Sequence, residues 1–73
     1  MQTFGQKAVG LSFNPSGDDA VAKCMQMLAD AIDQMNELRE AAGRGEQARL
    51  ASVAITELQA AAMRAVKALT WKD

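Results

Sequence analysis

Two pairs of carboxylates and one cysteine are the side chains of this chain whose types and spacing could support acid–base or nucleophilic chemistry. Asp18 and Asp19 are adjacent, and Asp30 and Asp33 are spaced i,i+3, so that the second pair would share one face of a helix. Paired carboxylates can act as general acid and base in hydrolysis. Cys24 is the only cysteine, and a cysteine thiolate can act as a nucleophile.

The residue types that the chain lacks exclude most kinds of active site. It has no His and no Tyr, which removes the most common general base and the most common nitrogen ligand for metals. Cys24 has no His to activate it, and no second Cys with which to form a disulfide or a zinc site. We therefore expect no metal and no cofactor.

Both carboxylate pairs have a structural explanation. Asp18 and Asp19 stand where a helix should begin, and the helix dipole favours acids at that end. Asp30 and Asp33 are followed by further polar residues, which indicates a solvated surface. A chain this short also has difficulty in building a walled pocket by itself, so we expect that the protein is not an enzyme.

The composition is that of one small folded domain, residues 1–73. Of 73 residues, 49% are hydrophobic and 23% are charged, as in ordinary globular chains. The net charge of -1 disfavours binding to a nucleic acid polymer. No stretch approaches the roughly 18 apolar residues of a membrane span, and the first ten residues lack the order of a secretory signal. We expect a soluble, intracellular protein that does not bind membranes.

Residues 1–17 are predicted to form a short helix and a turn. Thr3 and Gln6 match a capping box, and Gly10 is a typical helix terminator. A helix this short is not stable alone, and the apolar residues available to dock it are Phe4, Val9 and Leu11. In the turn, Phe13 either packs on the next helix or offers an aromatic surface on which a planar ring stacks.

Two long helices are predicted for residues 18–42 and 46–70, joined by a reversal at Gly43-Arg44-Gly45. In the first helix the apolar residues alternate steps of three and four, which is a heptad-like stripe. The stripe consists of Val21, Cys24, Met25, Leu28, Ala31, Ile32, Met35 and Leu38. It gives Cys24 an ordinary role as a small buried hydrophobe. The expected fold class is all-α, with an antiparallel helical hairpin after the short helix.

The second long helix is apolar around too much of its surface for one partner helix. One side carries Leu50, Val53, Ala54, Leu58, Ala61 and Ala65, and the apolar region is widened by Ile55, Ala62, Val66 and Leu69. Two apolar faces imply two sets of neighbours, and a chain of this length is marginal as a monomer. We therefore expect a compact homo-oligomer, with any ligand site between protomers.

Most of the chain resembles the phage anti-CBASS cyclic-oligonucleotide sponges, whose helical hairpin domain is shared with some Thoeris inhibitors. The residues that carry the resemblance are Leu11–Asp18, the helix ending near Leu38, the segment Leu50–Leu58, and Met63–Trp71. The resemblance implies a homohexameric immune-evasion protein in the host bacterial cytoplasm. Such a protein sequesters cyclic dinucleotides or trinucleotides without cleaving them.

The resemblance also implies a dinucleotide pocket between paired protomers. An aromatic residue of the N-terminal turn contacts a base there, which is Phe13 in this chain, beside Asn14. The resemblance also implies a Lys that contacts the phosphate, and the corresponding position in this chain is occupied by Met25. Lys23 is the nearest cation, but it lies about 200° from Met25 round the helix.

A separate trinucleotide pocket on a three-fold axis is implied as well. It is lined by the position of Met27 and by a late basic residue, Lys67, with Arg64 one turn earlier. Arg64 and Lys67 also complement the helix dipole, which is their structural role. Because Met25 lacks a charge while Lys67 is present, we expect cyclic trinucleotides to be favoured over dinucleotides.

Two other functions remain open on the residues alone. One is a structural helical oligomerisation or adaptor module, which the Met- and Ala-rich stripes favour. The other is an antitoxin-like regulator associated with DNA, which the net charge and the absence of a basic stripe disfavour.

Overall fold

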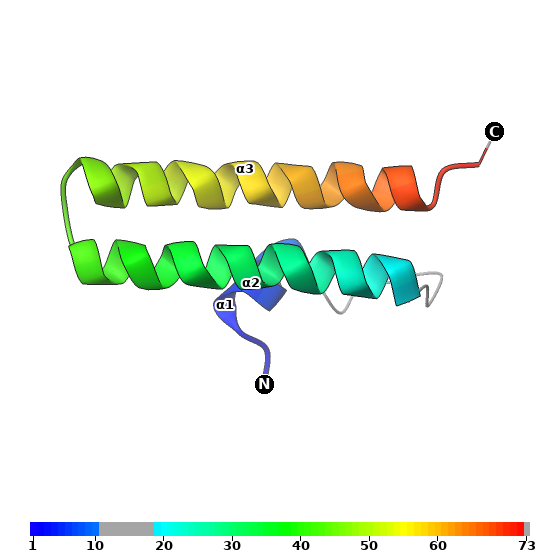
Figure 1. Ribbon diagram of the computed structural model, residues 1–73, viewed down its shortest axis with the longest axis horizontal. Helices are drawn as coiled ribbons and strands as arrows, with labels where there is room; N and C mark the ends of the chain where they lie inside the picture. Colours follow the sequence, from blue (N-terminus) through cyan, green and yellow to red (C-terminus); the bar gives the residue numbers. More distant parts are fainter. Residues whose placement is uncertain (11–18, 73) are drawn as a thin grey trace.

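Three helices form the structure, a computed structural model that describes residues 1–10 and 19–72. They are α1 (Phe4–Val9), α2 (Asp19–Ala42) and α3 (Glu46–Leu69). The two long helices run antiparallel, side by side, and α1 packs across α2 (Figure 1). The all-α prediction of a short helix followed by a helical hairpin is confirmed. No helix among the described residues is both long enough and apolar enough to cross a membrane.

The capping box predicted for α1 is present. The Gln6 backbone N–H donates to Thr3 Oγ1 over 3.1 Å, and the Thr3 backbone N–H donates to Gln6 Oε1 over 2.9 Å. Gly10 ends the helix in the left-handed conformation, with φ at 68°. These local signals suffice to start and stop a helix of two turns.

The docking of α1 differs from the prediction in the residues that it uses. Gly5 and Val9 are buried, whereas Phe4 is 45% exposed. Phe4 instead lies under the guanidinium of Arg39, whose Cζ is 5.5 Å from the ring centroid. Of the residues predicted to dock this helix, Val9 is buried, Phe4 contacts α2 at Arg39 from a half-exposed position, and Leu11 lies outside the described residues.

The contact between α1 and α2 also changes the interpretation of the second carboxylate pair. Asp30 is exposed, as expected of a solvated surface. Asp33 is half-buried, and its Oδ1 accepts a 2.7 Å hydrogen bond from the backbone N–H of Gly5. Gln26 and Gln6 add a side-chain hydrogen bond of 2.9 Å between the same two helices. Asp33 thus has a structural partner that helical spacing alone does not reveal.

The hydrophobic core lies where the three helices meet. Its buried members are Val9, Val21, Met25, Ala29, Ile32, Ile55 and Ala62. On α2 they are spaced by three and four residues; Val21, Met25 and Ile32 belong to the predicted stripe, whereas Ala29 does not. Cys24 is only half-buried, because Met25 takes the inward position at this level. The prediction of a buried cysteine is therefore only partly correct.

The reversal between the long helices is built on two glycines. Gly43 and Gly45 have φ values of 72° and 95°, in the region that residues with a Cβ rarely adopt. Gly45 gives no side-chain cap to α3. Glu46 in the first turn of α3 instead pairs with Arg49, and this guanidinium lowers the pKa of the Glu46 carboxyl.

The face of α3 that packs in the hairpin is the one predicted as an extension of the apolar surface. Ile55 and Ala62 are buried there, whereas Leu50 is 53% exposed and Val53 is also exposed. The sequence pattern predicts both apolar sides without indicating which one packs against α2, and the structure makes that choice. A second, uncovered apolar side remains, as expected for a helix with two sets of neighbours.

Candidate functional site

Every described residue of the predicted site lies in the part of the hairpin where α2 begins and α3 ends. These residues are Lys23, Met25, Met27, Arg64 and Lys67. The antiparallel arrangement places the first turns of α2 beside the last turns of α3 (Figure 1). Phe13 and Asn14, also predicted for the site, lie outside the described residues.

The three predicted residues of α2 point in different directions. Met25 is 4% exposed and belongs to the core, whereas Met27 is 62% exposed. Lys23 is exposed and lies two residues before Met25, which corresponds to about 200° round the helix. The Lys23 side chain therefore points to a different side of α2 from the Met25 side chain.

An apolar hollow of about 290 Å³ lies between the three helices. It is lined by Val9, Met25, Ala62, Met63 and Val66. No charged or hydrogen-bonding side chain is among these residues, so the hollow can accept apolar or planar groups but cannot hold a phosphate by itself. Val9 and Met63 were not predicted for the site, because the contact between α1 and α3 depends on the tertiary fold.

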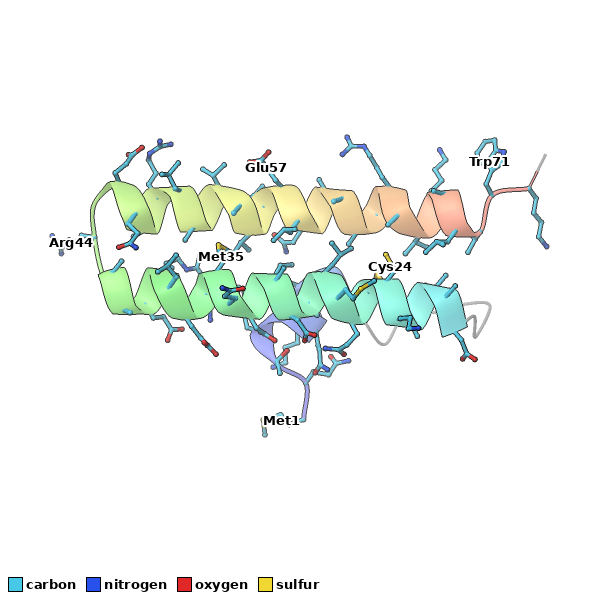
Figure 2. The ribbon with its side chains drawn as sticks, viewed as in Figure 1. Met1, Cys24, Met35, Arg44, Glu57 and Trp71 are labelled. Atoms are coloured by element: carbon cyan, nitrogen blue, oxygen red, sulfur yellow. The ribbon has the colours of Figure 1, made fainter. Side chains whose placement is uncertain are left out.

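A cation and an aromatic ring meet at the end of α3, one turn beyond this hollow. Lys67 follows Met63 by four residues, which places the two side chains on one face of the helix. The Lys67 Nζ lies 5.8 Å from the centroid of the Trp71 ring, within the range of a cation–π contact. Trp71 is 63% exposed and projects from the end of α3 away from α2 (Figure 2).

The backbone that carries Trp71 is fixed to the last turn of α3. The Thr70 backbone N–H donates to the Val66 carbonyl over 3.0 Å, and Thr70 Oγ1 donates to the same carbonyl over 2.7 Å. The Trp71 backbone N–H donates to the Ala68 carbonyl over 3.4 Å. These bonds extend the helix cap to Trp71, although Leu69 is the last helical residue.

A groove of about 560 Å³ runs along the opposite side of the hairpin. It is lined by Ala31, Gln34, Met35, Ala54, Glu57, Leu58 and Ala61. α1 packs at Ala29, and Ala31 of the groove lies about 200° further round α2, so this groove lies on the side that α1 does not cover. We refer to these seven residues as the open groove.

The ionisable side chains of the described residues are exposed or half-buried. No charged or polar residue among residues 1–10 and 19–72 is buried. In the same ranges, no three His, Cys, Asp or Glu side chains are grouped so that they could hold a metal ion. The features of this region that a ligand can contact are the exposed side chains of Arg64 and Lys67 and the apolar hollow.

A family model described as Acb2/Tad1, hairpin domain, matches residues 6–70. The match includes all of α2 and α3 and most of α1. Comparisons with curated proteins and with solved structures gave no match.

Proposed function

Because the chain belongs to the Acb2/Tad1 hairpin-domain family, which implies a phage sponge for cyclic nucleotides, we propose that it is an immune-evasion protein that sequesters cyclic dinucleotides or trinucleotides. These second messengers activate bacterial anti-phage defence, and a sponge lowers their free concentration in the host cytoplasm. The match over residues 6–70 is the observation that carries this proposal.

The surface at the end of α3 has the chemistry that such a ligand requires. Lys67 and Arg64 are exposed and lie one turn apart, so their cations are available to phosphates. The apolar hollow lined by Val9, Met25 and Met63 lies one turn before Lys67. Bases pack on apolar and aromatic surfaces while cations hold the phosphates.

Symmetry explains how a chain with net charge -1 holds a polyanion. In a homohexamer, a three-fold axis repeats each residue near it three times around a ligand of matching symmetry. One Lys67 then becomes three ammonium groups for the three phosphates of a cyclic trinucleotide. Met27 is 62% exposed and is proposed to line the same pocket.

The proposed dinucleotide pocket is weaker, because its Lys position is occupied by Met25. The Met25 side chain is in the core, and Lys23 faces a different direction. Phe13 and Asn14, which the resemblance implies as the base contacts of this pocket, lie outside the described residues. We therefore propose that cyclic trinucleotides are the preferred ligands.

Release of intact ligand follows from the available side chains. The chain has no His to act as a general base, and no carboxylate among the described residues is buried. The protein is therefore proposed to hold its ligand without cleaving it.

A structural oligomerisation module is the alternative function, and the open groove is the observation that favours it. Four of its seven lining residues are Ala or Met, namely Ala31, Met35, Ala54 and Ala61. Small residues allow helices of a second copy to approach closely. Self-association by itself fits both functions, so ligand binding has to distinguish them.

Calorimetric titration of the native protein with cyclic di-AMP, cyclic di-GMP and cyclic tri-AMP tests the proposal. A sponge binds at least one of these ligands, and the ligand recovered after heat denaturation is chromatographically unchanged. Linear or hydrolysed product formed in proportion to protein would contradict the non-enzymatic mechanism. A stable oligomer that binds none of the three would instead support the structural module.

A further inference from the structure

We propose that Trp71 forms part of the same site as Lys67, so that one base of the ligand stacks on the indole ring while its phosphate binds the Lys67 ammonium. This inference rests on the proposed function. It adds an aromatic contact from the end of α3 to the proposed trinucleotide pocket, for which no aromatic residue is expected from the sequence.

The first argument is the distance between the two side chains. Lys67 Nζ is 5.8 Å from the centre of the Trp71 ring, close enough for both groups to contact a single nucleotide. Proteins that bind nucleotides in single strands use the same combination of an aromatic platform for the base and a nearby cation for the backbone. Arg64, one turn before Lys67, adds a second cation to this end of α3.

The second argument is the exposure of a large ring at a fixed position. Trp71 is 63% exposed, although burial of an indole ring contributes more hydrophobic stabilisation than that of most side chains. Its backbone is held by hydrogen bonds to the last turn of α3. A ring that is both ordered at its backbone and available to solvent can stack on a base at low entropic cost.

The third argument is the role of the ring in placing the cation. A Lys side chain has four rotatable bonds and loses considerable entropy when it is fixed. The contact with Trp71 restricts the Lys67 ammonium to the neighbourhood of the ring before the ligand arrives. Trp71 therefore acts both as a stacking surface and as a positioning residue for Lys67.

The fluorescence of the native protein provides a direct test. Trp71 is the only Trp, and there is no Tyr, so tryptophan emission reports on this one side chain. We expect cyclic tri-AMP to quench this emission, with the same midpoint as that of calorimetric binding. Trp71→Leu should weaken the calorimetric affinity by roughly 5- to 100-fold, the range for loss of one stacked base, and Trp71→Phe should restore part of it.

Phe4→Leu is the matched control, because Phe4 is also an exposed ring against a cation, Arg39. This variant should leave the affinity for cyclic tri-AMP unchanged. The double variant Trp71→Leu with Lys67→Ala should lose less affinity than the two single variants added together, since both residues act on one nucleotide.

Two negative results have different meanings. If the native protein binds cyclic tri-AMP but Trp71→Leu binds it equally well, the role of Trp71 is wrong while the sponge function stands. If the native protein binds neither cyclic tri-AMP nor the two cyclic dinucleotides in calorimetry, the proposed function fails, and this inference fails with it.

Discussion

The backbone N–H of Gly5 in α1 lies 2.7 Å from Oδ1 of Asp33 in α2, and donates a hydrogen bond to it. Asp33 thereby satisfies one of the backbone N–H groups that the first turn of any helix leaves without an intrahelical partner. The same approach brings the Gly5 backbone against Ala29, so that a Cβ at position 5 would lie 2.1 Å from the Ala29 carbonyl oxygen. Position 5 therefore requires a glycine because of its neighbours, although its own φ is not positive.

Gly5→Ala should destabilise the protein by about 1–3 kcal/mol, as overpacking of a tight contact does. In an isolated helix, replacing Gly by Ala stabilises the helix by up to about 1 kcal/mol. A loss of stability in the protein would therefore show that the close contact between Gly5 and α2 outweighs this gain. Urea denaturation followed by circular dichroism measures it. Lys7→Ala, at an exposed position of the same helix, is the control and should change stability little.

Met25→Lys should destabilise the fold by on the order of 3 kcal/mol, because it places an ammonium without a counter-charge in the core. The Lys that the resemblance implies at this position would then destabilise this chain. Thermal unfolding of Met25→Lys and of the apolar control Met25→Leu checks this expectation. Equal stability of the two variants would show that the new Lys side chain reaches solvent through the apolar hollow.

Ala61→Glu should lower the mass of the assembly without loss of helix. Ala61 is exposed and lines the open groove, so a Glu is tolerated in a single chain but repels a second copy. Sedimentation velocity together with circular dichroism separates dissociation from unfolding. Ile55 is unsuitable for this test, because it is buried in the hairpin itself.

Thr56→Glu provides the matched control for the groove. Thr56 is exposed and lies about 140° from Ala61 round α3, so the same charge is added on a different side. The assembly formed by Thr56→Glu should have the same mass as that of the native protein in sedimentation velocity. A native chain that sediments as a stable monomer at micromolar concentration would rule out the proposed assembly.

Lys67→Ala should weaken binding of cyclic tri-AMP by about 10- to 100-fold, the loss expected for one charge-assisted contact to phosphate. If three copies of Lys67 meet one ligand, the loss should be larger. Calorimetry gives the affinity, and sedimentation should show an unchanged assembly. Arg44→Ala removes the same charge at the other end of the hairpin (Figure 2) and should bind as the native chain does.

The sequence by itself determined where helices begin and end. The capping box of Thr3 and Gln6, the terminator Gly10, and the pair Gly43 and Gly45 are local signals, and each acts as predicted. Local signals suffice for these features because capping and turn geometry depend on residues only a few positions apart. The apolar spacing of α2 and α3 likewise predicted a hairpin, since helical periodicity needs no knowledge of the partner.

The tertiary structure decided which side of each helix is used. Both sides of α3 are apolar, so the spacing alone could not tell that Ile55 packs in the hairpin while Leu50 stays exposed. The spacing also could not reveal the partners of Phe4 and Asp33, because each partner lies on another helix. The side that a helix turns toward its neighbour depends on which residues allow the two helices to pack closely. In α1 and α2 these include Gly5 and Asp33, which are 28 positions apart in the chain, so a local sequence pattern does not reveal the contact.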